Sequence, residues 1–474
     1  MASSSVLSTE HHTDSGRRRA AVFVATLSSF LGPFMGSSVN VALPAIGAEF
    51  SMGAVMLGWI NTAFLLAAAT FLIPFGRLGD LYGRKLIFIL GVGLLALSSA
   101  LLALAGSGGQ LITIRIFQGI SSAMVFATAM PLLIAVVPAQ ERGRAIGYTI
   151  AAVYLGLSTG PFFGGFITQY LGWRYIFGIN VPLGLSLLVV AVMRLRKDAG
   201  EHGHAKFDYL GSLILAVGLL LTMYGFSNLP SAVAGMMVLC GLVVLGAFVG
   251  YESRLKHPLV DMMLFRKNTI FAFSNLAALI NYAATFAVTF LLSLYLQKVR
   301  LLSPQAAGIV LVAQPIVMTI FSPLAGRLSD RIEPRTLASW GMGITALGLA
   351  MLAFLAAATP LAYIVASLIV LGFGFALFSS PNTNAIMSAV DRRMYGVASS
   401  VVSAMRQIGM MFSMGIVAML LSVFIGSAQL SSENAPQFLQ CARVAFAVFA
   451  ALCCAGVFAS LARGKVARPG AATS

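Results

Sequence analysis

The chain has 474 residues, of which 59% are hydrophobic and only 9% charged, whereas an average soluble protein carries roughly 25% charged residues. A soluble fold could not cover so much apolar surface, so the composition excludes a soluble enzyme and predicts an all-α polytopic membrane protein. The net charge of +16 does not predict nucleic-acid binding, because Lys and Arg occur in short clusters between apolar runs instead of on one solvated face.

Fourteen apolar runs are long enough to cross a bilayer as helices, which takes about 20 residues. We expect them at residues 20–44, 55–76, 86–106, 111–135, 145–168, 174–194, 208–228, 232–252, 270–296, 306–327, 336–357, 360–383, 397–425 and 442–462. The predicted organisation is a tail (1–19), an N-terminal six-helix bundle (20–196), a linker with two extra transmembrane helices (197–261), a C-terminal six-helix bundle (262–463) and a second tail (464–474). The first run is too long for a signal peptide and is predicted to remain as a helix.

The positive charges alternate between the connections of these runs. If the N-terminus is cytoplasmic, the inside connections hold the great majority of the 30 Lys and Arg residues. The exceptions are Arg174, Lys298, Arg300 and Arg443 on the outside, and Arg115 and Arg406 within or at the ends of spans. Positive charge favours the cytoplasmic side, so both termini are predicted to be cytoplasmic, in a multi-pass protein of the cell (inner or plasma) membrane.

A short motif occurs twice, in equivalent connections. "GRLGDLYGRK" (76–85) follows the second span and "GRLSDRIEPR" (326–335) follows the tenth. Parallel six-span repeats with a site between the halves are one way to build a transporter. The motif is either a tight positive turn or a charged latch between the halves; we favour the latch. Its predicted gating residues are Gly76, Asp80, Gly83, Arg84, Lys85, Gly326, Asp330 and Arg331.

Two arginines are predicted to lie in spans. Arg115 and Gln118 share one face of the fourth span, and Arg406 lies in "MRQIG" of the thirteenth. A charge inside a membrane helix usually faces a partner or a water-filled cavity, although Arg115 could instead reach the outer interface. These three residues are coupling candidates.

The fifth span contains "GLSTGPFFGG" (156–165). Gly156, Gly160 and Gly164 recur every four residues, which gives a smooth face for close helix packing. Pro161 interrupts the helical hydrogen bonding. Packing alone explains the glycines, whereas glycines with a proline at mid-span predict a bend used in gating.

These motifs together resemble the major facilitator superfamily, in its fourteen-span drug:proton antiporter group. The resemblance rests on the 76–85 loop, on Arg115, Gln118 and Gly119, and on the glycines and Pro161 of the fifth span. Further matches are "WRYIFGINVPLG" (173–184), "SLYLQ" (293–297) and "SSPNTNAI" (379–386). It implies two six-helix bundles with an inserted two-helix hairpin, and an alternating-access transporter that exchanges small molecules for protons.

One residue of the resembled pattern is missing. The group usually carries an aspartate in the first span. The corresponding segment of this chain is "FLGPFMGSSVNVALP" (30–44), and alignment on Val39–Pro44 places Met35 at the position of that aspartate. All 14 acids fall in loops or at helix ends, and the five histidines fall in predicted cytoplasmic segments. A proton relay normally uses Asp, Glu or His in the membrane. The remaining candidates for a cavity are Met35, Asn40, Asn61, Tyr154, Asn281, Gln314 and Asn382.

The predicted function is therefore proton-linked efflux of lipophilic small molecules by a secondary active transporter. The alternative is an uncoupled or differently coupled carrier of a neutral or anionic metabolite, and a third possibility is a non-transporting receptor or scaffold. We expect no enzymatic activity, no cofactor and no metal. The expected partners are a small-molecule substrate, protons and the lipid bilayer, with no nucleic acid, and the chain is expected to act as a monomer.

Overall fold

The computed structural model describes residues 2–138, 141–195, 207–255, 258–259, 262–329, 331–390, 394–426, 428–431 and 433–463. Within these ranges the chain forms only helices and their connections. Fourteen helical segments are long and apolar enough to cross a membrane, which confirms the predicted all-α fold. The predicted tail 464–474 and the predicted gating residue Asp330 lie outside the described residues.

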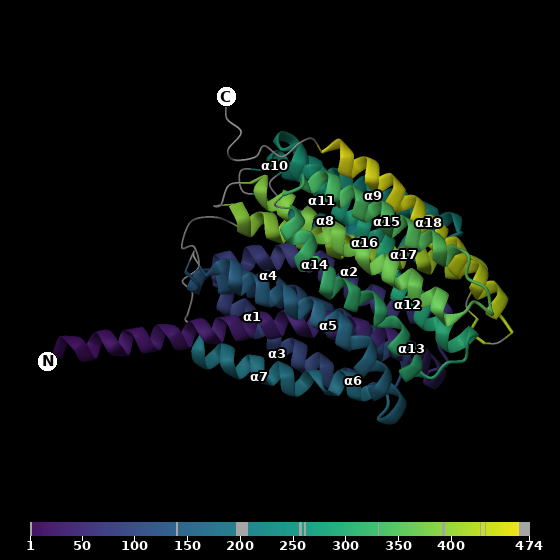
Figure 1. The fold of residues 1–474 in the computed structure, drawn as a ribbon, viewed down its shortest axis with the longest axis horizontal. Helices are drawn as coiled ribbons and strands as arrows, with labels where there is room; N and C mark the ends of the chain where they lie inside the picture. The colour runs from purple at the N-terminus through teal and green to yellow at the C-terminus, as the bar shows by residue number, and fades with distance from the viewer. Residues whose placement is uncertain are drawn as a thin grey trace.

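The N-terminal bundle contains the first six spans. Its helices are α1 (Ala2–Glu49), α2 (Ala54–Tyr82), α3 (Arg84–Ala103), α4 (Gly108–Val136), α5 (Arg142–Tyr170), α6 (Arg174–Gly178) and α7 (Asn180–Arg194). α6 and α7 share one span. α6 ends at Gly178, four residues before Pro182, whose ring excludes the carbonyl group four positions earlier. α1 starts before the predicted span 20–44 and projects from the bundle (Figure 1).

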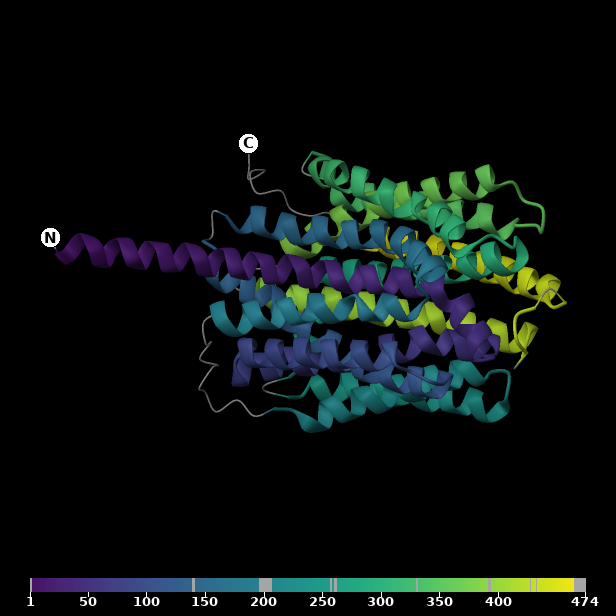
Figure 2. The ribbon, with the colours of Figure 1, turned by 90° about the horizontal axis from the view of Figure 1, so that it is seen from below.

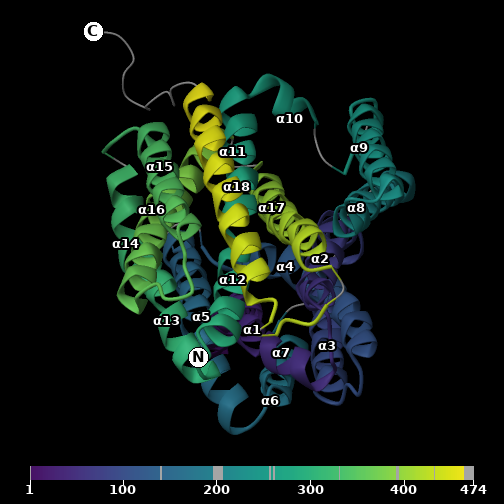
Figure 3. The same cartoon turned by 90° about the vertical axis from the view of Figure 1, so that its right-hand side faces the viewer.

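A hairpin of α8 (Tyr209–Asn228) and α9 (Ala232–Glu252) follows, and the short helix α10 (Met262–Lys267) leads into the second bundle. α8 packs against α2 and α17, one helix from each bundle, and Figure 3 shows the hairpin at the edge of the molecule beside them. α9 leaves Met236, Leu239 and Val243 exposed, as expected for a lipid-facing helix. The hairpin therefore lies outside the two bundles.

The C-terminal bundle contains the last six spans. Its helices are α11 (Thr269–Thr285), α12 (Ala287–Leu294), the π-helical turn η1 (Tyr295–Val299), α13 (Pro304–Leu311), α14 (Ala313–Ser329), α15 (Pro334–Ala353), α16 (Leu361–Ser388), α17 (Tyr395–Phe424) and α18 (Ala435–Ala462). α13 and α14 share one span. α13 ends at Leu311, four residues before Pro315, so the same proline effect that separates α6 from α7 explains this break.

The two ends of the molecule differ. The start of α1, the end of α18 and the α2–α3 connection at Gly83 lie at one end, which we call the open end; the α1–α2 connection, residues 50–53, lies at the other, which we call the closed end (Figures 1 and 2). Gly83 has φ of 101°, a left-handed conformation that glycine adopts without strain. It lets α3 turn back directly after α2.

Small residues bring α1 and α5 into close contact. A Cβ atom on Gly164 would lie 2.6 Å from Ser38 Cα, and one on Gly156 would lie 2.5 Å from the carbonyl oxygen of Phe30. This closeness lets Ser38 Oγ donate a hydrogen bond to the carbonyl oxygen of Gly160 (2.9 Å). The predicted packing face of the fifth span thus meets α1, within the N-terminal bundle.

We expect Gly164→Ala to destabilise the protein by about 1–3 kcal/mol, because the added methyl group overpacks a backbone contact. Gly147→Ala is the matched control in the same helix, since a Cβ there meets no heavy atom within 4 Å. Thermal unfolding of the two purified variants checks this. Equal melting temperatures would show that α1 and α5 can separate without loss of stability.

Candidate functional site

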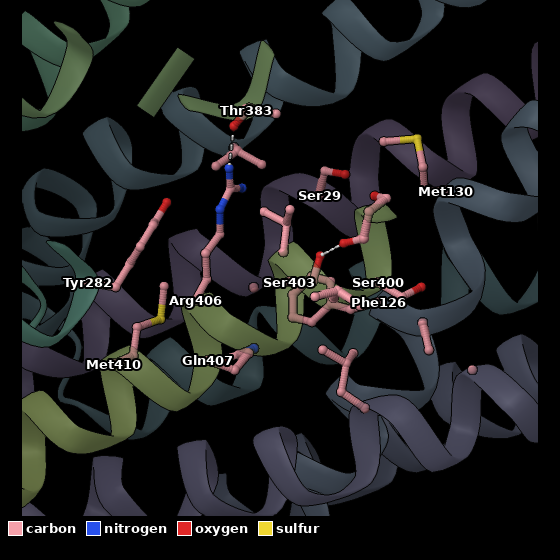
Figure 4. A pocket seen from close by; sticks show the side chains of 18 of the residues that line it. Ser29, Phe126, Met130, Tyr282, Thr383, Ser400, Ser403, Arg406, Gln407 and Met410 are labelled. Atoms are coloured by element: carbon pink, nitrogen blue, oxygen red, sulfur yellow. Dashed lines mark hydrogen bonds between the residues drawn. The ribbon is translucent and has the colours of Figure 1, made fainter. Parts of the chain in front are cut away.

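One large cavity lies between the two bundles. Its volume is about 2050 Å³, and its walls come from α1, α2, α4 and α5 on one side and from α11, α14, α16 and α17 on the other. Figure 4 shows part of it, with Phe126 and Met130 of α4 near Ser400 and Ser403 of α17. The lining reaches from Arg84 and Lys267 at the open end to Asn40 near the closed end. The cavity is therefore a site that both bundles build.

Direct contacts between the bundles shut the closed end. α1 accepts two hydrogen bonds from the C-terminal bundle: Ser293 Oγ donates to the carbonyl oxygen of Asn40 (2.7 Å) and Gln297 Nε2 to that of Val41 (2.9 Å). The backbone N–H of Ala54 donates to the carbonyl oxygen of Ala428 (3.1 Å). These bonds hold the bundles together at the closed end of the cavity.

Helices α5 and α13 complete this closure by close backbone packing. A Cβ on Gly308 of α13 would collide with the carbonyl oxygen of Pro161 of α5, and a Cβ on Gly165 would collide with that of Pro304. Pro161 of the predicted bend motif thus faces the other bundle and lines the cavity, whereas Gly156, Gly160 and Gly164 pack on α1. α5 itself is continuous through Pro161.

At the open end, the ion pairs among the described residues each stay within one bundle. Arg18 pairs with Glu141 (3.0 Å), Arg84 with Asp80 (2.9 Å) and Arg335 with Glu333 (3.8 Å). The cavity is therefore open at one end and closed at the other, which is the geometry of one state of an alternating-access cycle.

The predicted gating residues that the structure describes differ in their position relative to this opening. Gly76, Asp80 and Arg84 line the cavity, whereas Lys85 donates to the carbonyl oxygens of Val192 and Leu195 in its own bundle. Gly326 does not line it; the carbonyl oxygen of Gly326 accepts from Ser329 Oγ (2.7 Å). Arg331 is exposed. In this state Asp80 pairs with Arg84 of its own bundle.

The structure separates the predicted cavity residues into two groups. Asn40, Asn61, Tyr154 and Gln314 line the cavity, and Met35, Asn281 and Asn382 do not. Met35 instead faces a small void among α1, α3 and α4. Asn382 Nδ2 donates to the carbonyl oxygen of Ser274 (3.0 Å), inside the C-terminal bundle. Asn281 is fully buried in α11. A polar residue in a span can thus face its own bundle, which its position in the sequence does not reveal.

Arg115 is buried in α4 and held by its own bundle. Its Nε donates to the carbonyl oxygen of Ile60 (3.0 Å), its Nη1 to Gln118 Oε1 (2.6 Å) and its Nη2 to Asn61 Oδ1 (3.5 Å). The guanidinium also lies 4.3 Å from the centre of the Phe64 ring. It lines the cavity with only 1% of its surface exposed, whereas Gln118 does not line it. Arg115 therefore joins α4 to α2 and does not reach the outer interface.

Arg406 lies on the opposite wall and is held far less completely. Its Nη2 donates to Thr383 Oγ1 (2.8 Å), and the guanidinium lies 5.6 Å from the centre of the Tyr282 ring. Its Nε is buried without a hydrogen-bond partner among the described residues. Figure 4 shows the side chain extending from α17 toward Thr383 of α16, with Tyr282 of α11 beside it.

The described lining carries more positive than negative charge. Its cations are Arg77, Arg84, Arg115, Arg266, Lys267 and Arg406, and its acids are Asp80 and Glu252, both toward the open end. Apolar side chains such as Phe126, Met318 and Phe375 form much of the rest. Within the described ranges, no three His, Cys, Asp or Glu residues are placed to hold a metal ion.

Sequence reasoning missed a third buried arginine, Arg463. It follows the last span directly and was counted among the cytoplasmic charges, but its side chain is fully buried. Its Nη1 donates to Asn382 Oδ1 (2.8 Å) and its Nη2 to the carbonyl oxygen of Pro334 (2.8 Å). Burial lowers the pKa of this guanidinium to about 10, so Arg463 stays charged at neutral pH and joins α18 to α16 and α15.

Comparisons with known proteins agree with this architecture. The family model described as Major Facilitator Superfamily matches residues 24–208 and 275–473. Multidrug resistance protein Stp of Mycobacterium tuberculosis is 32% identical over 82% of this chain and 73% of the relative. Riboflavin transporter RibZ of Clostridioides difficile is 29% identical over 83% of this chain and 86% of the relative. The tetracenomycin C resistance and export protein of Streptomyces glaucescens is 29% identical over 88% of this chain and 79% of the relative.

Solved structures share the fold at lower identity. A bacterial homologue of the human lysosomal transporter Spinster, in an inward-facing and unoccupied conformation, superposes with a TM-score of 0.67 at 17% identity, over 94% of this chain and 97% of the other. The human organic anion transporter MFSD10 superposes with a TM-score of 0.63 at 15% identity, over 94% of this chain and 99% of the other.

Proposed function

The chain belongs to the Major Facilitator Superfamily, and on that premise we propose that it exports lipophilic small molecules by alternating access, in exchange for protons. It is a multi-pass membrane transporter and not an enzyme. The observation that carries the proposal is the cavity between the bundles, which is open at one end and shut at the other by contacts that cross between them.

The contacts at the closed end are of a kind that can separate. They are hydrogen bonds to single carbonyl oxygens and the glycine-lined contact between α5 and α13. The ion pairs within each bundle at the open end leave Asp80 and Arg84 at the mouth of the cavity. In the opposite state, the bundles would meet around these residues and separate around Pro161 and Gly308.

We propose that the open end is cytoplasmic, with both termini on that side of the cell membrane. The sequence places most Lys and Arg in the connections at that end, as the positive-inside rule requires. A single chain encloses the cavity from both sides, so the working unit is a monomer.

The apolar lining supports a lipophilic substrate. Binding sites for small molecules are mostly apolar with a few polar groups that fix orientation. Met130, Met318 and Met410 line the cavity together with Phe126 and Phe375. Methionine side chains adapt their shape to different ligands, so the lining suits several related molecules.

A second candidate is a differently coupled carrier of a neutral or anionic molecule. The acids among the described lining residues, Asp80 and Glu252, lie toward the open end, and the cations Arg115 of α4 and Arg406 of α17 lie deeper in the lining. A proton exchanged through the cavity would have to bind near its mouth. A substrate with its own negative charge could instead be driven outward by the membrane potential, which contributes roughly 2.3 kcal/mol per charge for 100 mV.

Efflux from proteoliposomes, with the pH gradient and the membrane potential set independently, tests both candidates. Proton-linked export predicts that efflux of a lipophilic dye rises with an imposed pH gradient at zero potential. Efflux that is independent of the pH gradient and depends on the membrane potential would contradict proton-linked export and support the second candidate. If no molecule in a panel of neutral, anionic and cationic dyes is transported, both fail.

We expect Asp80→Asn to lower transport at least about fivefold with little loss of stability, because exposed ion pairs contribute only about 0–1 kcal/mol. The latch interpretation requires this carboxylate in the opposite state, whereas among the described residues it pairs here with Arg84 alone. Glu141→Gln is the control, since it removes another open-end ion pair, with Arg18. Wild-type efflux from the Asp80 variant would eliminate the latch.

A further inference from the structure

We propose that Arg406 is the binding site for an anionic group on the transported molecule, so that the preferred substrates are lipophilic organic anions. This inference rests on the proposed transport function and names the substrate class of the same cavity. It starts from a difference between the two arginines on opposite walls.

Arg115 is closed to a ligand by its burial, since only 1% of its surface is exposed. Each of its three nitrogen atoms donates to an acceptor of its own bundle, and its flat face is covered by Phe64. A guanidinium carries five N–H donors in a fixed fork. Three of these donors at Arg115 already bind acceptors of its own bundle, and burial covers the other two.

Arg406 has donors to spare. Its interactions with the described residues are one hydrogen bond, to Thr383, and the contact with the Tyr282 ring. A buried N–H group without a partner is unfavourable, because it has lost its hydrogen bonds to water. Nε of Arg406 is such a group, and Nη1, unlike Nη2, donates to none of the described residues. This part of the wall is therefore left with unused hydrogen-bonding capacity.

The two contacts of Arg406 fix its direction without neutralising it. Thr383 on α16 holds Nη2, and Tyr282 on α11 lies beside the guanidinium (Figure 4). Neither partner is negatively charged. Along the described lining the acids Asp80 and Glu252 lie toward the open end, and Asp80 is paired with Arg84. The positive charge of Arg406 thus has no counter-ion at mid-molecule among the described residues.

A bound carboxylate or sulfonate would supply that counter-ion. Guanidinium–carboxylate hydrogen bonds are charge-assisted and are roughly twice as strong as neutral ones. Met410, Phe375 and Met318 line the same region, so an apolar body could pack next to the charged group. A cationic molecule of the same shape would be repelled by Arg406 and would find no mid-cavity acid in the described lining.

Three dansyl probes of nearly equal size test the proposal: dansylglycine, which carries a carboxylate, its neutral amide, and cationic dansyl-ethylenediamine. Dansyl fluorescence reports binding to the full-length protein in nanodiscs. We expect dansylglycine to bind at least about tenfold more tightly than the amide, and the cationic probe to bind most weakly; tenfold corresponds to about 1.4 kcal/mol.

Arg406→Gln should reduce the affinity for dansylglycine to that for the amide while leaving the amide unchanged. Arg406→Lys should restore part of the difference, because it keeps the charge but loses the planar fork. Arg254→Gln, which removes an exposed arginine outside the cavity lining, should change nothing. The comparison of the three probes on the wild-type protein does not depend on any variant folding.

The outcomes separate this proposal from the transport function. Equal affinity of the wild type for the carboxylate and the amide, or equal weakening of both by Arg406→Gln, would overturn the anion site. Efflux of a neutral dye would leave the transport function intact in that case. Preference for dansylglycine that disappears in Arg406→Gln and persists in Arg254→Gln supports the site.

Discussion

Gly308→Ala should shift the protein away from the state described above and toward the one that opens the closed end. The added methyl group would collide with the carbonyl oxygen of Pro161, and the carbonyl carbon would lie 3.1 Å away. Overpacking of this kind is unfavourable by about 1–3 kcal/mol, which changes a two-state equilibrium by about 5–150-fold. The contact joins α13 to α5, so the penalty applies only while the two bundles touch there.

Spin-label distances measure this shift. Cysteines introduced at Gly109 and Ala358, exposed positions in different bundles at the closed end, should report longer distances in the Gly308→Ala variant. The exposed Cys240 and Cys454 are replaced by serine in all variants. Gly343→Ala is the control, since a Cβ there meets no heavy atom within 4 Å. An unchanged distance in a protein with a lowered melting temperature would mean that α5 and α13 stay together throughout the cycle.

Arg115→Gln should nearly abolish transport, with a fall of at least about tenfold. The substitution removes the hydrogen bonds to Ile60, Asn61 and Gln118 and the contact with Phe64. Hydrogen bonds between membrane helices contribute about 0.6 kcal/mol each on average, so the two that join α4 to α2, at Ile60 and Asn61, amount to about 1 kcal/mol. The loss frees α4 from α2 at this point of the cavity wall, and it leaves Oδ1 of Asn61 and Oε1 of Gln118 without the donor that they have here.

Efflux rate and melting temperature, measured together, check this prediction. Both should fall in Arg115→Gln, whereas Arg194→Gln, at an exposed arginine, should change neither. Arg115→Lys should transport poorly as well, because one ammonium group cannot reach the acceptors on both helices. Normal efflux with a lowered melting temperature would show that Arg115 stabilises the bundle and has no part in transport.

The spans could be predicted from the sequence because lipid imposes one requirement on every crossing segment, namely about 20 apolar residues in a helix. The repeat at 76–85 and 326–335 likewise predicted two related halves. The breaks after Gly178 and Leu311 were missed, although Pro182 and Pro315 lie four residues beyond them. Prolines such as Pro33 and Pro74 lie within unbroken helices, so a proline alone does not predict a break.

The candidate site could be predicted less completely. Both Arg115 and Arg406 are embedded cations in the sequence, and their different roles follow only from their partners. Arg115 meets three acceptors on α2 and α4, whereas Arg406 meets Thr383. Asn382 faces Arg463 inside its bundle, and the sequence gives no signal for this, because Arg463 directly follows a span and resembles an ordinary cytoplasmic charge. Helix rotation decides these contacts, and apolar composition does not determine it.

The central claim is that transport requires the closed end to open. A disulfide between cysteines introduced at Ala54 and Ala428, whose backbones are joined by a hydrogen bond of 3.1 Å, tests this most directly in the background lacking Cys240 and Cys454. Oxidation should stop efflux from proteoliposomes while binding from the open end persists, and reduction should restore efflux. Full efflux from the oxidised, cross-linked protein would contradict alternating access through this cavity.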